Sequence, residues 1–317
     1  MILLLSTLSF AHHDSVVTRV GASPGATAAS LAVPLPRAEL GLSSSLDRFT
    51  RVLWEGDLRA QKLEQGAMLG TLTPSVGLRI KSQTAFVVAL PVGQVFYGDG
   101  SQDRGLGDLN LAVAQSLGPK KGPWSVDLQA GVSAPTGLYR QESSYSVTTV
   151  LTPDAGEAMV FTSDSRISLG MGTFALSASG AARLEAGRNT LIVSAGLSQP
   201  IGWTSDQIWW GQDYSLGAGG LHAVGKKRRL MLGGTLQGAA HTQNRIVADE
   251  AESSAEVLRS GARQELSVNG VATVQVHKRV GCGLALQVPI IQHADSIQLV
   301  RGTGVSTQCG VGLSASK

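Results

Sequence analysis

The stretch that decides the fold is residues 105–139, GLGDLNLAVAQSLGPKKGPWSVDLQAGVSAPTGLY. In both halves, apolar residues such as Leu111, Val113 and Leu128 alternate with small or polar residues. This period of two is typical of a β-strand with two different faces. Residues 118–123, GPKKGP, carry the Gly and Pro residues of a turn. The stretch therefore predicts a hairpin of two strands.

The turn also predicts which residues of the two strands face each other. The expected pairs are Leu117–Trp124, Val113–Leu128 and Leu111–Ala130 on one side, and Ala114–Asp127 and Ala112–Gln129 on the other. One face is then apolar and the other is small or polar, which also occurs in soluble β-sandwiches. Lipid outside and a polar lumen inside is the pattern of a transmembrane β-barrel. We favour the barrel over a secreted soluble β-protein because the pattern repeats along the chain and follows a candidate export signal.

Composition and charge agree with a chain of many short strands. The 317 residues include 39 Gly, 15% are charged and 5% are aromatic, and the mean hydropathy is +0.10. The aromatic content is low for the interfacial girdles of a membrane barrel. A dispersed net charge of +3 argues against nucleic-acid binding. Because no run of 18 apolar residues occurs, a conventional transmembrane helix is excluded.

The N-terminus predicts export. The start, MILLLSTLSFAHHD, has an apolar core and a small-x-small pattern at Ser9-Phe10-Ala11. We expect residues 1–11 to be a signal peptide, either short or truncated at its start, because a basic n-region is missing. Residues 12–37 are rich in Ala, Ser, Gly and Pro and are expected to form a flexible segment or a lumen plug. The barrel is expected over residues 38–317.

The remaining strand patterns predict one antiparallel up-and-down barrel of about twelve strands. Two strands come from the hairpin, and the others are expected at 38–49, 68–80, 84–97, 166–185, 190–203, 207–224, 230–245, 264–276, 282–292 and 298–315. Short turns and longer loops alternate between them. This asymmetry is typical of outer-membrane barrels, whose short turns are periplasmic and whose long loops are external.

Three short motifs resemble a known family. They are Gly105-Leu106-Gly107-Asp108-Leu109, Pro135-Thr136-Gly137 and Ser168-Leu169-Gly170-Met171-Gly172-Thr173. Together they are similar to the bacterial outer-membrane barrels labelled as transporters of the phenol-degradation meta-cleavage pathway, from about Leu40 onward. The resemblance implies a barrel that passes small, apolar or aromatic molecules. The C-terminus departs from such barrels, because Gly312–Lys317 lacks a terminal aromatic residue.

Several polar residues and both cysteines are candidates for a role in the barrel. Pairing of the last two strands brings Cys282 opposite Cys309, which predicts either a cross-strand disulfide or two free thiols. Pairing of 207–224 with 230–245 brings His241 opposite Asp213 on the polar face, either as a pH-sensitive lumen pair or as ordinary polar lining. The lumen lining is expected to include Asp108, Asn110, Asp127 and Gln129.

The sequence thus predicts an outer-membrane channel for small molecules, with no catalytic residue, metal or cofactor. Its expected partners are the lipid bilayer and a small-molecule substrate. Three alternatives stay open: a non-conducting barrel whose loops at 140–164 and 247–263 bind a partner, an embedded hydrolase using His241, and a soluble secreted sandwich. A hydrolase would need a nucleophile within reach of a base, and no local Ser/His motif is present.

Overall fold

The computed structural model describes most of the chain from residue 38 onward. The described ranges are 38–53, 61–81, 83–98, 100–117, 122–137, 147–151, 159–163, 169–205, 207–225, 229–247, 257–260, 262–277, 280–294 and 298–313. The expected signal peptide at 1–11 and the segment at 12–37 lie outside them. None of these ranges contains a helix long and apolar enough to span a membrane.

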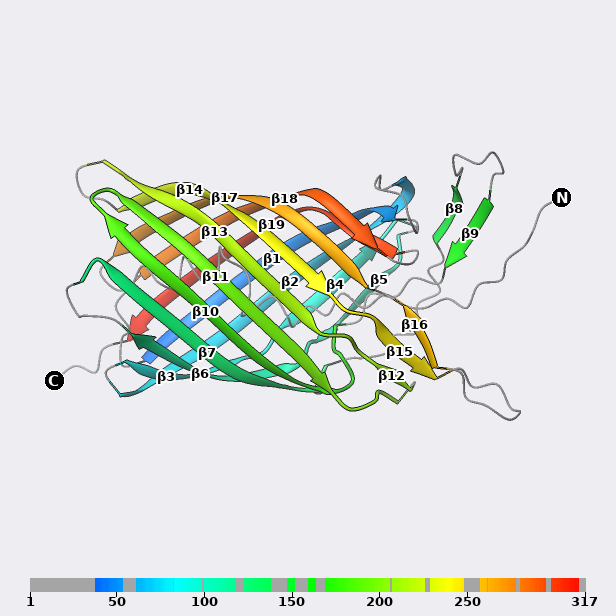
Figure 1. The fold of residues 1–317 in the computed structure, drawn as a ribbon, viewed down its shortest axis with the longest axis horizontal. Coiled ribbons are helices and arrows are strands. Elements are labelled where there is room, and N and C mark those ends of the chain that lie inside the picture. The colour runs from blue at the N-terminus through cyan, green and yellow to red at the C-terminus, as the bar shows by residue number, and fades with distance from the viewer. Residues whose placement is uncertain are drawn as a thin grey trace.

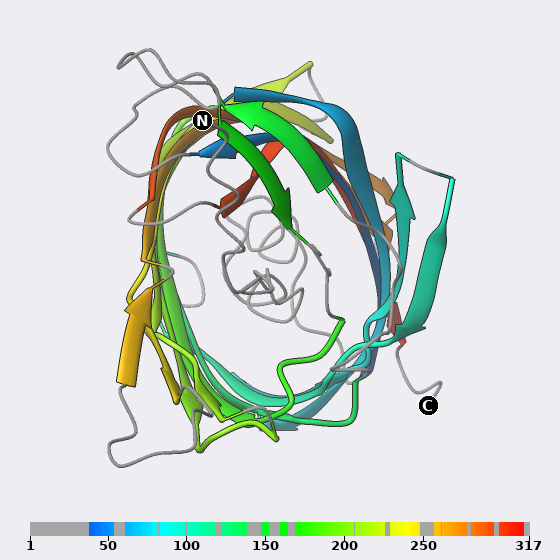
Figure 2. The same cartoon turned by 90° about the vertical axis from the view of Figure 1, so that its right-hand side faces the viewer.

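Fourteen strands form one antiparallel sheet that closes on itself (Figure 2). In wall order they are β1 (Ala38–Leu53), β19 (Gln298–Leu313), β18 (Val280–Ala294), β17 (Arg263–His277), β14 (Leu230–His241), β13 (Asp213–Val224), β11 (Asn189–Ile201), β10 (Phe174–Ala186), β7 (Trp124–Ala134), β6 (Leu109–Leu117), β3 (Thr84–Ala89), β2 (Gln61–Lys81), β4 (Val92–Tyr97) and β5 (Gln102–Leu106). The ring closes because β1 pairs with both β19 and β2. β3 and β4 are consecutive segments that both pair with β2, so they count as one strand of the barrel. In the same way β5 pairs with β4 and β6 with β3, so β5 and β6 count as one strand. The barrel therefore has 12 strands. The predicted barrel and strand number are confirmed, and the sandwich is excluded.

The two faces of the wall differ as the alternation predicts. On β11, Leu191 and Val193 are 54% and 59% exposed on the outside, whereas Ile192 between them is 3% exposed. The same outward rows of Leu, Val and Ile continue around the barrel. The inner face carries Ser, Thr, Asn, Gln and charged residues together with a buried apolar cluster of Ile192, Leu221, Val271 and Ala285. Large apolar side chains that point away from the protein all around a closed sheet are the lipid-facing belt of a transmembrane barrel.

The two ends of the barrel are different (Figure 1). At the end of the barrel where β19 ends, neighbouring strands are joined by short turns such as Gly187-Arg188, where Gly187 adopts a φ of +65°. Glycine favours this left-handed conformation because it has no Cβ. The other end carries the longer connections, with β8 (Val147–Leu151) paired to β9 (Met159–Ser163), and with β12 (Ile208–Trp209), β15 (Asn244–Val247) and β16 (Val257–Ser260) forming a second small sheet. The predicted asymmetry of short turns and long loops is confirmed.

The register predicted for the first hairpin is wrong by two residues. Leu117 faces Val126 rather than Trp124, and Val113 faces Ala130 rather than Leu128. In this register Trp124 lies beyond the end of β6, and its register partner is Leu184 of β10. Because a shift by two preserves the alternation, the apolar and polar faces are as predicted.

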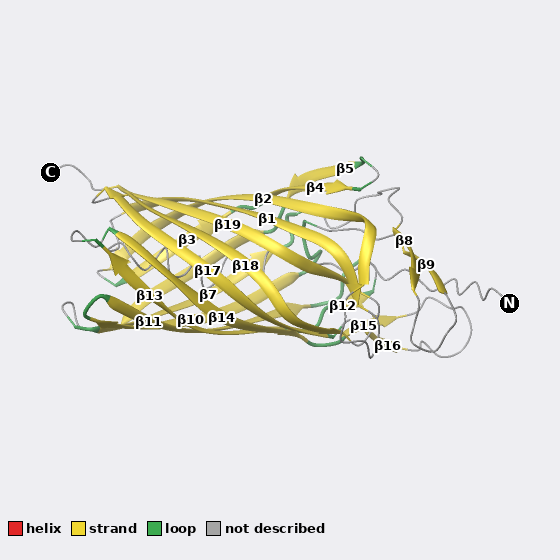
Figure 3. Cartoon of the chain, turned by 90° about the horizontal axis from the view of Figure 1, so that it is seen from above, coloured by secondary structure: helices red, strands yellow, loops and turns green. Residues whose placement is uncertain are grey.

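Three predicted strands differ from the structure: one is interrupted, and two begin later than expected. The strand at 84–97 is interrupted at residues 90–91, where Pro91 has no N–H to donate to a ladder. Beyond this break, β4 and β5 project from the wall as a hairpin (Figure 3), and β5 pairs with no described strand other than β4. The strands expected from residues 166 and 207 begin only at Phe174 and Asp213. The residues before them form the glycine-rich contacts and the rim cavity described below.

Cys282 and Cys309 are register partners on β18 and β19 and are joined by a disulfide. The bond lies near the short-turn end, since Val280 at the start of β18 already pairs with Val311. It ties the last two strands of the chain together beside the seam where β19 meets β1.

Candidate transport lumen and outer mouth

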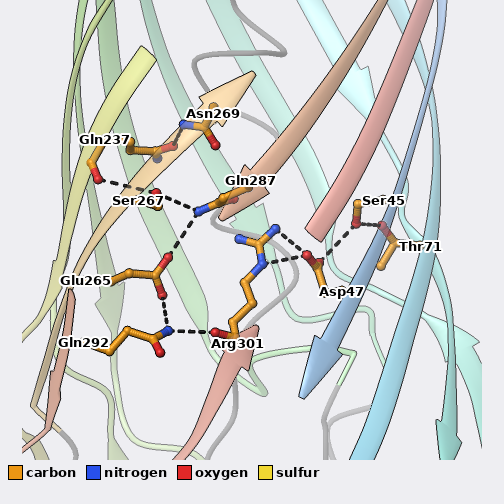
Figure 4. Close-up of polar contacts among 10 residues, drawn as sticks. All are labelled: Ser45, Asp47, Thr71, Gln237, Glu265, Ser267, Asn269, Gln287, Gln292 and Arg301. Carbon is orange, nitrogen blue, oxygen red and sulfur yellow. Dashed lines mark hydrogen bonds and ion pairs between the residues drawn. The ribbon is translucent and has the colours of Figure 1, made fainter. Parts of the chain in front are cut away.

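A chain of polar contacts runs along the inside of the wall at the seam (Figure 4). It begins at Asp47 of β1, which is 0% exposed. Arg301 of β19 donates from Nε to Oδ1 of Asp47 at 2.6 Å, and a second guanidinium nitrogen forms an ion pair with the same oxygen. Ser45 donates to the other carboxylate oxygen at 3.4 Å and also lies 2.8 Å from the hydroxyl of Thr71 on β2. The charge of the buried carboxylate is thereby compensated by Arg301 of β19 and by a hydroxyl group of its own strand.

The contacts continue onto β18 and β17 through Gln292. Its amide nitrogen donates to the main-chain oxygen of Arg301 at 2.7 Å and to Oε2 of Glu265 at 3.0 Å, so both of its hydrogens are used. The other oxygen of Glu265 accepts from Gln287 at 3.1 Å, and Gln287 also donates to Ser267 at 3.0 Å. Glu265 is therefore held by two neutral amides.

The last members of the chain lie on β17 and β14. Asn269 donates to Thr235 at 3.2 Å and to Gln237 at 3.4 Å. Beside the seam, the inner wall encloses a small cavity of about 110 Å³ whose polar lining includes Ser43, Ser45, Asp47, Thr71, Thr73 and Arg301. Hydroxyl, amide and charged groups thus occur on the inside of each of β2, β1, β19, β18, β17 and β14, beside buried apolar residues such as Leu69 and Ala285. Such a surface can exchange hydrogen bonds with water or a polar solute.

Three of the four residues predicted to line the lumen face inward on the opposite wall. Asn110 of β6 and Asp127 and Gln129 of β7 occupy the rows that alternate with the exposed Val113 and Leu128. The carboxylate of Asp127 accepts a hydrogen bond from Ser116 of the neighbouring strand. Their role in passage stays a proposal.

The fourth, Asp108, lies between β5 and β6 and is 0% exposed. Oδ1 of its carboxylate accepts from the backbone N–H of Gly137 at 2.9 Å, and Oδ2 accepts from that of Met171 at 2.8 Å. One side chain thereby joins the three motifs that the family resemblance singled out, although they are up to 63 residues apart in sequence. We call Gly107-Asp108, Gly137 and Leu169–Met171 the Asp108 junction.

Glycines allow the close approach of backbones at this junction. A Cβ at Gly137 would lie 2.7 Å from the carbonyl carbon of Gly107, and one at Gly170 would lie 2.7 Å from Oδ1 of Asp108 and 2.9 Å from Gly137. A Cβ at Gly107 would lie 3.0 Å from Cβ of Pro91. Gly107, Gly137 and Gly170 are thus explained by packing, since no other residue lacks a Cβ.

Burial and hydrogen bonding act in opposite directions on the pKa of Asp108, which immediately precedes β6 at the end of the barrel with the longer connections. Burial raises the pKa of its carboxyl, and the backbone N–H groups of Met171 and Gly137 lower it in part, so the net shift is upward. Burial disfavours the charged form, whereas two N–H donors stabilise it.

His241 and Asp213 lie opposite each other at the ends of β14 and β13, 2.8 Å apart between Nδ1 and Oδ1. The second ring nitrogen, Nε2, lies 2.9 Å from Oδ1 of Asn244. That oxygen also accepts from the backbone N–H of Gly211 at 2.8 Å, which identifies it as the acceptor end of the amide. Both nitrogens of His241 therefore face oxygen atoms, which fixes the orientation of the ring.

The hydrogen bonding of His241 does not favour the hydrolase alternative. In the part of the chain that the structure describes, its two ring nitrogens contact Asp213 and Asn244 rather than a serine or threonine hydroxyl. A base that activates a nucleophile needs that hydroxyl within hydrogen-bond reach.

A cavity of about 660 Å³ lies beside His241 at the end of the barrel that carries the long connections. Its lining comes from the ends of β11, β14, β17 and β18 and from the small sheet, and includes Trp209, Trp210, His241, Arg245, Arg263 and His293. Trp210 is buried and donates from Nε1 to the main-chain oxygen of Met171 at 2.9 Å. The cavity wall is therefore connected to the Asp108 junction.

Sequence reasoning missed Trp210, the pair Asp47–Arg301 and the contacts of Glu265. Asp47 and Arg301 are 254 positions apart, and only the closure of β1 onto β19 brings them together. The sequence does show a polar residue at an inward position of each strand. That pattern does not predict that β1 and β19 are neighbours, so it could not predict this pair.

Comparison with known proteins supports the fold. Neither a family model nor a curated protein matches the sequence. Among solved structures, an outer membrane channel from Pseudomonas putida F1 matches with a TM-score of 0.64 and 13% identity, over 88% of this chain and 96% of that one. The translocator domain of the autotransporter NalP from Neisseria meningitidis matches with a TM-score of 0.46 and 9% identity, over 90% and 92%. A deletion mutant of the monoaromatic hydrocarbon channel TodX matches with a TM-score of 0.45 and 10% identity, over 90% and 92%. Together with the apolar outer belt, the first of these likenesses shows that the chain has the fold of an outer-membrane β-barrel channel.

Proposed function

We propose that the chain is an outer-membrane channel for the passive passage of small molecules, with apolar or aromatic compounds as the expected class. The observation that carries the proposal is the opposite character of the two faces of one closed wall. Apolar side chains cover the outside, and hydrogen-bonding side chains line the inside of at least six consecutive strand positions. The aromatic preference is supported by the motif resemblance and by the paired indoles of Trp203 and Trp209, whose centroids are 5.6 Å apart beyond the wall strands.

Planar-bilayer conductance of the refolded full chain tests this proposal. We expect discrete current steps in KCl, and a lower current when phenol is added than when the same concentration of glucose is added. Correctly folded protein that leaves the bilayer sealed would contradict the proposal and favour the non-conducting barrel whose loops bind a partner.

Neighbouring residues of β17 provide a matched control. Ser267 is buried in the inner polar chain, whereas Val268 is 45% exposed on the outer face. Ser267→Trp should reduce the conductance because it fills the lumen, and Val268→Trp should leave it unchanged because the indole enters lipid. The hydrolase alternative instead predicts an esterase activity that is lost in His241→Ala.

A further inference from the structure

The rim cavity beside His241 has a chemistry that differs from the inner wall. Its lining contains two indoles, two arginines and two histidines, and no Asp or Glu. The inner wall, by contrast, pairs its arginine with a buried carboxylate. A cavity of about 660 Å³ falls within the size range of small-molecule binding sites.

Backbone pairing sets an aromatic and a cationic residue side by side in this cavity. Trp209 of β12 and Arg245 of β15 are direct register partners, so their side chains leave the small sheet on the same face. Both line the cavity, and Arg245 is exposed. An indole beside a guanidinium offers a flat apolar surface next to a bidentate donor.

The opposite wall of the cavity contributes a second arginine. His241 of β14 and Arg263 of β17 are register partners. His241 is held by Asp213 and Asn244, which fixes its ring at the mouth. His293 of β18 pairs with Gln264 at the same rim and lines the cavity as well. An anion in the cavity would thus lie beside Arg245 of β15, Arg263 of β17 and His293 of β18.

The walls are rigid because their backbone positions are held from outside the cavity. Trp210 is hydrogen-bonded to Met171 and packs with it and with Ala175. The edge of Trp209 meets Trp203 at an interplanar angle of 69°. The backbone N–H of Gln212 donates to Thr242 at 2.7 Å, and that of Thr242 donates back to the oxygen of Gln212 at 2.9 Å. Preorganised donors and aromatic surfaces bind a ligand with less loss of entropy.

We propose that this cavity is a binding site for small aromatic carboxylates at the outer mouth of the barrel. The ring lies against Trp209, and the carboxylate accepts hydrogen bonds from Arg245 in the field of Arg263. The proposal rests on the proposed channel function for its biological purpose, which is to select anionic aromatic solutes before they enter the lumen. It does not require that the barrel conduct.

Isothermal titration of the refolded full chain with benzoate tests the site. Benzyl alcohol is the neutral probe of the same shape, and cyclohexanecarboxylate is the charged probe without an aromatic ring. We expect saturable benzoate binding that is at least about tenfold tighter than that of either control, because a charged hydrogen bond and ring stacking are each lost in one control. Equal binding of benzyl alcohol, or no saturable binding of benzoate, would overturn the proposal.

Variants distinguish the site from general attraction of anions. Arg245→Gln should weaken benzoate binding about tenfold or more, and Trp209→Ala should weaken it while Trp209→Phe restores it. Arg188→Gln removes the same charge from an exposed turn at the opposite end of the barrel and should have no effect. An equal loss in Arg188→Gln would overturn the assignment.

Conductance separates this inference from the channel proposal. Current steps without benzoate binding would refute the binding site and leave the channel intact. Benzoate binding in a sealed bilayer would refute the channel and leave the site intact.

Discussion

Replacing Gly170 by alanine should destabilise the Asp108 junction without touching the barrel wall. The added Cβ would lie 2.7 Å from Oδ1 of Asp108 and 2.9 Å from both the Cα and the carbonyl carbon of Gly137. Two of these three atoms are backbone, so no flexible side chain can move aside. Gly170 is not among the glycines with positive φ. The cost is therefore one of overlap and not of backbone conformation.

The expected loss of stability follows from the atoms that the new Cβ would displace. To remove the overlap, Gly137 and Asp108 have to separate, which lengthens the 2.9 Å bond from the Gly137 N–H to Oδ1. Overpacking of this kind costs about 1–3 kcal/mol. If the loss is confined to the junction, amide exchange at Gly137 and Met171 should become roughly 5- to 150-fold faster.

Hydrogen exchange of the protein in detergent micelles, read by mass spectrometry, measures this effect. Gly270→Ala is the matched control, because a Cβ at Gly270 on β17 would meet nothing within 4 Å. Peptides that contain Gly137 and Met171 should lose protection in Gly170→Ala and keep it in Gly270→Ala. Unchanged exchange in Gly170→Ala, or an equal change in both variants, would refute the packing argument.

Three further predictions concern charge and cross-links. Because burial raises the pKa of Asp108, the folded protein binds this proton more tightly than the unfolded chain. The protonated Asp108 therefore contributes stability in full below the ordinary pKa of Asp, and this contribution is lost as the pH rises through the raised pKa. Urea unfolding measured across acidic pH should show this decline in the free energy of unfolding. In Asp108→Asn the decline should be smaller. Arg301→Met removes the ion pair of the buried Asp47 and should lower the free energy of unfolding by about 3–5 kcal/mol. The double variant Asp47→Leu/Arg301→Met should regain stability in the same urea assay. If it does not, the loss in Arg301→Met does not come from the broken ion pair. Cys282→Ser opens a cross-link spanning 27 positions and should cost about 2–4 kcal/mol, a loss that dithiothreitol should reproduce in the wild type but not in the variant.

The sequence was sufficient for the features that repeat along every strand. Alternation predicted both the barrel and the orientation of residues such as Asp127 and Leu128, because the period of two survives errors of register. It did not predict that Trp124 would pair with β10, since the length of a turn does not say where the first ladder bond forms. A local pattern is enough when the interaction is between neighbouring strands.

Features that depend on three-dimensional closure could not be predicted. The glycines of the three motifs were visible, but their shared partner Asp108 appears only when loops 63 positions apart meet. The same holds for the seam pair Asp47–Arg301. The mouth cavity needs the ends of four wall strands and a small sheet that the alternation did not predict, because its strands are only two to four residues long.

The orientation of the two faces is tested most directly by arginine at two adjacent positions of β11. Val193 is 59% exposed on the outer face, and Ser194 is its inward-facing neighbour. Unfolding by guanidinium from phospholipid vesicles should show a loss of about 2–4 kcal/mol for Val193→Arg if the residue lies near the bilayer midplane, and much less for Ser194→Arg. Equal losses, or a larger loss for Ser194→Arg, would contradict a barrel that turns its apolar rows toward lipid and encloses a polar lumen.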